Sequence, residues 1–103
     1  MNMTNFKLVL AQIEAHLETW DQREVHSWDG TKHCFAGWCQ IFALGGTVKH
    51  GVPFNSVPGA MFIHQQAIKQ AIKFLDVSWE VAMYLFSYDR SLEDFRTFAA
   101  KVQ

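Results

Sequence analysis

Apolar residues recur at steps of three and four along the first twenty positions of the chain. The positions with this spacing are Phe6, Val9, Leu10, Ile13, Leu17 and Trp20. Lys7, Gln12 and Glu14 fall between them. The pattern predicts an amphipathic helix over residues 4–20, because side chains three and four positions apart share one face of a helix. Thr4 is the expected N-cap of this helix.

A polar segment, residues 21–31, separates this helix from the most apolar part of the chain. It ends in an Asp-Gly-Thr sequence, and Asp-Gly is a strong turn signal. The next stretch, about 32–44, is apolar around most of a helix circumference, which is typical of a helix buried at the centre of a domain. We expect Thr31 to cap this central helix and Gly45 with Gly46 to end it.

The least apolar face of the predicted central helix is narrow. His33, Gly37 and Gln40 align on it at steps of four and three. Glycine costs a helix roughly 1 kcal/mol relative to alanine, so Gly37 predicts that a neighbouring element passes close by. The three residues together form a candidate functional face.

A sustained apolar stripe predicts a third helix, which begins between Pro58 and Gln65 and ends near Leu75. The residues on this stripe are Val57, Ala60, Met61, His64, Ala67, Ile68, Ala71, Ile72 and Leu75. Residues 45–56, which precede it, form the longest segment without a periodic pattern.

Two shorter helices are predicted at the C-terminal end. Ser78 is a suitable N-cap for a helix that runs through Phe86. Ser91 and Asp94 have the spacing of a capping box and open the last helix. The apolar side of that last helix consists of Leu92, Phe95, Phe98, Ala99 and Val102.

These patterns predict an all-α fold: a single compact domain over residues 1–103, with about five helices around the central helix at about 32–44. The composition agrees with this prediction. Half of the 103 residues are apolar and 15% are aromatic, which is enough to build a core at this length. Charged residues make up only 18%, so the chain does not resemble a disordered one.

The net charge of the chain and the length of its apolar runs exclude some classes of function. The formal net charge of −1 leaves no basic excess for binding nucleic acid without sequence preference. No apolar run is long enough to span a bilayer, and the first residues lack the basic start of a signal peptide. We therefore expect a cytoplasmic protein that contacts neither nucleic acid nor membrane, with Cys34 and Cys39 as free thiols.

The start of the predicted central helix also forms a motif. From Gly30 to Trp38 the chain has Gly-Thr-Lys-His-Cys-Phe-Ala-Gly-Trp. This stretch resembles a G-T-x-H-C-x-A-G-W motif of small uncharacterised bacterial and phage proteins, cyanobacterial ones among them. Residues 74–86 are similar to a second segment of those proteins, with Asp76 where glycine is usual. The resemblance implies a shared helical fold and brings no assigned activity.

His33 and Cys34 suggest a thiol enzyme as one hypothesis. A cysteine in the first turn of a helix has its pKa lowered by the positive end of the helix dipole. His50 or His64 is then the candidate general base. The alternative is that Cys34 packs as a small hydrophobe, as free cysteines usually do. Because the chain carries no papain-like local signature, we favour a protein that is not an enzyme.

A metal site is a further hypothesis, with His26, His33 and Cys34 as its ligands. Structural zinc sites usually bring close ligand pairs such as C-x-x-C or H-x-x-x-H. The chain has no such pair, so we expect neither a metal nor another cofactor.

Residues 67–86 have the apolar spacing of a helix-turn-helix. In a DNA-binding protein of this kind the second helix presents polar and basic side chains to the major groove. Here that helix, 78–86, holds one acidic residue and no basic one. Two short helices packed around a tight turn explain the same pattern without DNA.

The chain has more aromatic residues than the core of a domain of this size can easily bury. Trp79, Met83 and Phe86 follow one another at steps of four and three and predict an exposed stripe on the fourth helix. Such side chains are enriched at protein interfaces. The sequence therefore favours a small binding or regulatory protein that acts through a protein partner or as a homo-oligomer.

Overall fold

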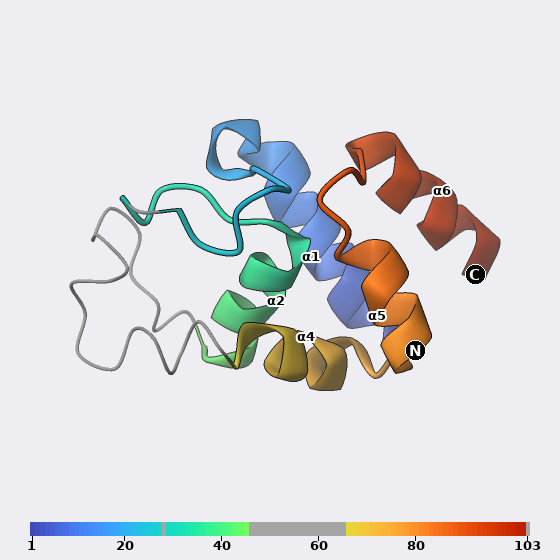
Figure 1. The fold of residues 1–103 in the computed structure, drawn as a ribbon. Helices are drawn as coiled ribbons and strands as arrows, with labels where there is room; N and C mark the ends of the chain where they lie inside the picture. Colours follow the sequence, from blue (N-terminus) through green and yellow to red (C-terminus); the bar gives the residue numbers. More distant parts are fainter. Residues whose placement is uncertain (28, 46–65, 103) are drawn as a thin grey trace.

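The computed structural model describes residues 1–27, 29–45 and 66–102, and within these ranges the chain forms five α-helices (Figure 1). They are α1 (Met3–Ala15), α2 (Phe35–Ala43), α4 (Ala67–Leu75), α5 (Trp79–Leu85) and α6 (Leu92–Val102), and a short 3-10 helix, η1 (Leu17–Thr19), follows α1. The described ranges contain no β-strand, only isolated bridges from His33 to Trp20 and to His26. The predicted all-α fold is confirmed.

Helix α2 lies between α1 and α4 and packs against both (Figure 1). All seven residues from Phe35 to Ile41 are buried, which confirms the prediction of a central helix. A helix that is apolar on most of its surface gains stability from contacts on every side, so the central position follows from its composition.

Three packed phenylalanines join the N- and C-terminal helices through α2. Phe35 of α2 stacks on Phe95 of α6 with ring centroids 4.4 Å apart, and Phe6 of α1 lies 4.9 Å from Phe35. All three side chains are fully buried. Leu75 and Leu85 bring α4 and α5 into the same core.

Helix α2 begins three residues later than its pattern predicts. Its N-cap is Cys34, whose Sγ accepts a hydrogen bond from the Gly37 amide at 3.5 Å, and Thr31 does not cap it. The residues before Phe35 pair with the preceding loop instead of turning into a helix. The His33 amide donates to the Thr19 carbonyl at 2.9 Å, and the Cys34 amide donates to the Glu24 carbonyl at 2.6 Å.

Thr31 closes the Asp-Gly turn. Its hydroxyl donates to the Asp29 carboxylate at 2.7 Å, and the Ser27 hydroxyl donates to the same oxygen. These two hydroxyls lower the pKa of Asp29 to about 2, with Thr31 as the larger cause. Gly30 has a left-handed φ of 74° in this turn, which explains the glycine there.

The C-terminal end of α2 is as predicted in its described part. The helix ends at Ala43, one residue before the expected boundary, and Gly45 follows with a left-handed φ of 67°. The Gly45 amide donates to the Phe42 carbonyl at 3.1 Å and so satisfies one of the free carbonyl groups at the end of the helix. Gly46 lies outside the described residues.

Gly37 permits the close approach that its presence predicts. A Cβ atom at this position would lie 1.9 Å from the carbonyl oxygen of Val25, closer than any side chain atom can come. The loop formed by residues 20–34 therefore crosses directly over the first turn of α2.

Helix α1 is shorter than the predicted helix at 4–20. Asn2, not Thr4, is its N-cap, with Oδ1 accepting from the Asn5 amide at 2.9 Å. The backbone leaves the helix at His16, and the Thr19 hydroxyl satisfies the His16 carbonyl at 2.6 Å. Leu17 thereby leaves the apolar stripe and is 54% exposed.

Helices α4, α5 and α6 match their predicted boundaries where the structure describes them, except that α5 ends at Leu85, one residue before the predicted end. Ser78 caps α5, with its hydroxyl accepting from the Val81 amide at 3.2 Å. Ser91 and Asp94 form both bonds of the capping box, at 2.9 and 3.2 Å. The third predicted helix is described only from Ala67, and residues 46–65 lie outside the described ranges.

Within the described residues, none of the helices has the length and apolar character needed to cross a membrane.

Candidate functional site

Four polar side chains form a continuous chain of contacts through the interior. We call them the histidine–glutamine chain: His33, His26, Gln40 and Gln70. The two Nδ1 atoms of His33 and His26 lie 2.7 Å apart, and His26 Nε2 lies 2.6 Å from Gln40 Oε1. Gln40 Nε2 then donates to Gln70 Oε1 at 2.6 Å. His33 and Gln40 are fully buried, and His26 is 5% exposed.

The hydrogen positions along this chain follow from its acceptors. The Gln40 carbonyl oxygen can only accept, so His26 Nε2 carries a hydrogen. A neutral His26 then has a bare Nδ1, which accepts from the Nδ1–H group of His33. With both imidazoles neutral, one hydrogen lies between them, and the hydrogen bonds from His33 to Gln70 then all run in one direction. The chain ties loop 20–34 to α2 and α2 to α4.

The predicted face of His33, Gly37 and Gln40 is therefore internal, and His33 joins it from the loop before α2, not from the helix as predicted. Loop 20–34 covers it: His26 bridges the two polar side chains, and Val25 lies against Gly37. The ring of His33 also meets the edge of Trp38 at a centroid distance of 5.2 Å. The structure brings the three residues together with these neighbours, at a place that solvent does not reach.

Cys34 is buried, with 3% of its surface exposed. Burial raises the pKa of its thiol to about 11, although the Gly37 amide lowers it. At neutral pH the thiol therefore keeps its proton, which is the opposite of the lowered pKa that the enzyme hypothesis requires. Cys39 is fully buried and its pKa is also raised by burial. The candidate bases His50 and His64 lie outside the described residues.

The proposed metal ligands His26 and His33 do meet, at hydrogen-bond distance. Cys34 uses its sulfur to cap α2. In the part of the chain that the structure describes, no three His, Cys, Asp or Glu side chains gather as a metal site requires.

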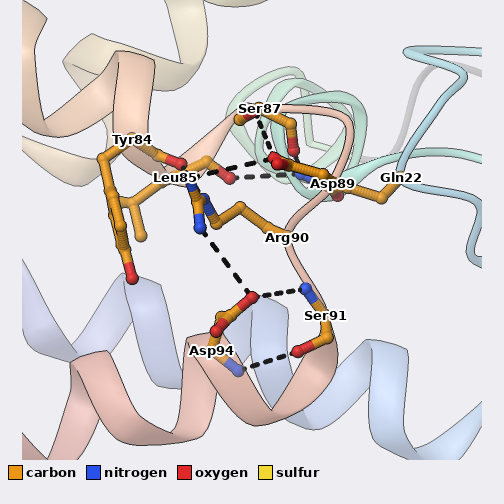
Figure 2. A network of polar contacts seen from close by, with 8 residues as sticks. All are labelled: Gln22, Tyr84, Leu85, Ser87, Asp89, Arg90, Ser91 and Asp94. Carbon is orange, nitrogen blue, oxygen red and sulfur yellow. Dashed lines mark hydrogen bonds and ion pairs between the residues drawn. The ribbon is translucent and has the colours of Figure 1, made fainter.

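A second polar network joins the end of α5 to the start of α6 (Figure 2). Gln22 from loop 20–34 donates to the carbonyls of Leu85 and Ser87 at 3.1 and 3.0 Å. Arg90 Nε donates to the Tyr84 carbonyl at 2.8 Å, and its guanidinium lies 4.2 Å from the Tyr84 ring centre. These contacts satisfy the free carbonyls at the end of a helix, so we assign the network a structural role.

An apolar groove runs between α4 and α5. We call it the α4–α5 groove; it has a volume of about 780 Å³ and is lined by Ile68, Lys69, Ile72, Trp79, Met83, Phe86 and Ser87. Trp79 is 64% exposed and Met83 40% exposed, while Phe86 is half-buried. The stripe predicted from sequence is thus one wall of this groove.

Sequence reasoning missed the other wall. Ile68 and Ile72 are four residues apart on α4, and their pattern places them with the core residues Ala71 and Leu75. In the structure Ala67, Ala71 and Leu75 are fully buried, whereas the two isoleucines remain partly exposed. The stripe of α4 is wider than the surface that α2 covers, and the surplus forms the groove.

The residues of the Gly30–Trp38 motif now have structural explanations: a left-handed turn at Gly30, the buried polar contact of His33, the cap of Cys34 and the close approach at Gly37. The relation to other proteins with this motif stays a prediction. Comparison of the chain with protein-family models, with curated proteins and with solved structures gives no match.

Proposed function

We propose that this protein works by binding another protein chain, and that the apolar face of a helix of that chain packs into the α4–α5 groove. The observation that carries the proposal is the exposed indole of Trp79 beside a groove of about 780 Å³. Contiguous exposed apolar side chains commonly mark interaction sites, and tryptophan is enriched among residues that dominate binding energy.

The geometry of the groove supports a helix as its occupant. Its walls are two short helices, and Trp79 and Met83 stand one turn apart on the same side of α5. A shallow apolar channel between helices is the surface used in helix-in-groove recognition, where side chains at steps of three and four enter the channel.

The other hypotheses receive less support from the described residues. A buried thiol with a raised pKa is a poor nucleophile, which weighs against a thiol enzyme. The exposed positions of α5 are Trp79, Glu80, Met83 and Tyr84, without a base to meet phosphate groups. This composition favours a protein partner over DNA.

The test compares the wild-type chain with Trp79→Ser and with the control Leu17→Ser, which removes an exposed apolar side chain outside the groove. Each full-length protein is immobilised and exposed to an extract of the source cells, and bound proteins are quantified. We expect a partner that binds wild type and the Leu17 variant and is depleted roughly 30-fold or more on the Trp79 variant. Equal binding by all three proteins would overturn the proposal.

A further inference from the structure

We infer that the occupant of the α4–α5 groove is a second copy of this chain, arranged by two-fold symmetry with Lys69 of each copy facing Glu80 of the other. The inference rests on the proposed function and names its partner. It follows from the shape and from the charges of the groove.

The shape is self-complementary. Trp79 and Met83 form one wall of the groove and also project from α5 into solvent. A ridge and a groove therefore lie side by side on the same surface. A two-fold axis places that surface against itself, so the ridge of each copy enters the groove of the other.

The charges complete the match. Lys69 is the charged residue among those lining the groove. Glu80 lines the neighbouring hollow between α5 and α6 and adjoins Trp79 on the exposed side of α5. Neither takes part in the ion pairs found among the described residues. A foreign helix would have to supply its own acid for Lys69. A second copy already carries an acid next to the tryptophan that fills the groove.

The size of the surface sets the expected affinity. The groove spans two short helices, so the buried area falls at the low end of specific interfaces. We expect a dimer with a dissociation constant on the order of micromolar.

Sedimentation equilibrium over a range of protein concentrations tests the dimer. We expect wild type and Leu17→Ser to dimerise alike and Trp79→Ser to dimerise roughly 30-fold or more weakly. A wild-type chain that stays monomeric at roughly millimolar concentration overturns this inference, because the expected affinity is on the order of micromolar. The proposed function then depends on the capture experiment, which detects a foreign partner whether or not the chain self-associates.

A charge exchange tests the arrangement. Lys69→Glu and Glu80→Lys each place like charges opposite one another twice per dimer, so each variant alone should dimerise roughly 10-fold more weakly at low ionic strength. An equimolar mixture of the two variants restores one positive and one negative side chain at both contacts. We expect the mixture to form a mixed dimer with near wild-type affinity.

The control mixture combines Lys7→Glu with Glu80→Lys. Lys7 is exposed on α1, outside the groove, so its substitution changes the net charge equally without changing the contact. The paired arrangement would be overturned if the control mixture recovered wild-type affinity. It would also be overturned if the mixture of the Lys69 and Glu80 variants did not recover it.

Discussion

Burial decides what the individual side chains of the Gly30–Trp38 motif can do. Cys34 and His33 are chemically versatile residue types, and a sequence alone permits a nucleophile or a metal ligand at their positions. In the folded protein the sulfur caps a helix and the imidazole contacts a second histidine. Both groups are buried, so they stabilise the fold through these contacts and are shielded from reactants.

Cys34 should label slowly in the native protein. With its pKa at about 11, its thiolate fraction at neutral pH is roughly 100-fold below that of an ordinary cysteine thiol, and burial adds a barrier to access. The measurement is the rate of reaction with a thiol probe across pH, for the native and the urea-unfolded chain. Fast native labelling with an apparent pKa below the ordinary value would revive the thiol enzyme hypothesis.

The same pKa predicts a direction for alkaline stability. The folded chain holds the Cys34 proton up to about pH 11, whereas the unfolded chain releases it near the ordinary value of 9.0. Between these values the folded state binds more protons, so the free energy of unfolding falls as the pH rises. Removal of the thiol in Cys34→Ala should make this part of the pH profile less steep, and the buried Cys39, whose pKa is also raised, retains the remaining slope.

Gly37→Ala should destabilise the protein although alanine is the better helix former. Propensity favours alanine by roughly 1 kcal/mol, but its Cβ would lie 1.9 Å from the Val25 carbonyl oxygen and must displace loop 20–34. We expect a net loss of about 2–3 kcal/mol in the free energy of unfolding, measured by urea denaturation.

The matched control for that substitution is Ala43→Gly, at an exposed position of the same helix. Because Ala43 is the last residue of α2, the change should cost at most about 1 kcal/mol, through propensity alone. A Gly37→Ala variant more stable than wild type would show that the loop does not hold its place over α2.

Among the elements, loop 20–34 determines where α2 begins and what covers its polar face. It delays the start of the helix through backbone pairing with Thr19 and Glu24, and it covers the polar face through His26. Gln22 extends from the same loop to the end of α5. This polar segment thus connects η1, α2 and α5.

Gln40→Leu tests the histidine–glutamine chain that this loop forms with α2 and α4. Leucine removes the acceptor for His26 Nε2 and the donor to Gln70 inside the core. We expect a loss of roughly 1–3 kcal/mol in the free energy of unfolding, measured by denaturant titration.

Gln70→Leu is the control for the chain. Gln70 is only partly buried, and water can replace its amide near the surface, so this substitution should cost less than Gln40→Leu. Equal effects of the two substitutions would argue that the buried end of the chain contributes no more than its exposed end.

In the molecule as a whole, the apolar side chains both fill a shared core and line an open groove. The packed rings of Phe6, Phe35 and Phe95 fill the space between α1, α2 and α6. Helices α4 and α5 pack on this core with one side, and their remaining apolar side chains line the groove. The dimer that we infer would continue this packing across a two-fold axis.

Local pattern was sufficient for the helices whose signals are local. The periodicity of three and four identified the buried centre of the fold, and the caps at Ser78 and Ser91 bond residues three positions away. Glycine at position 37 predicted a close neighbour without naming it. These features depend on residues within one or two turns, so they can be read from the linear chain.

Tertiary structure decided the rest, because the partners are distant in sequence. Asn2 replaces Thr4 as the cap of α1 where the Asn2 amide bonds to the Leu75 carbonyl at 2.7 Å. Cys34 becomes a buried cap, not a reactive thiol, because the backbone just before α2 pairs with Thr19 and Glu24 and so delays the start of the helix. Ile68 and Ile72 become a groove wall only when α5 folds beside α4. Periodicity shows that a side chain is apolar, whereas the packed neighbours determine whether it is buried or left exposed for a partner.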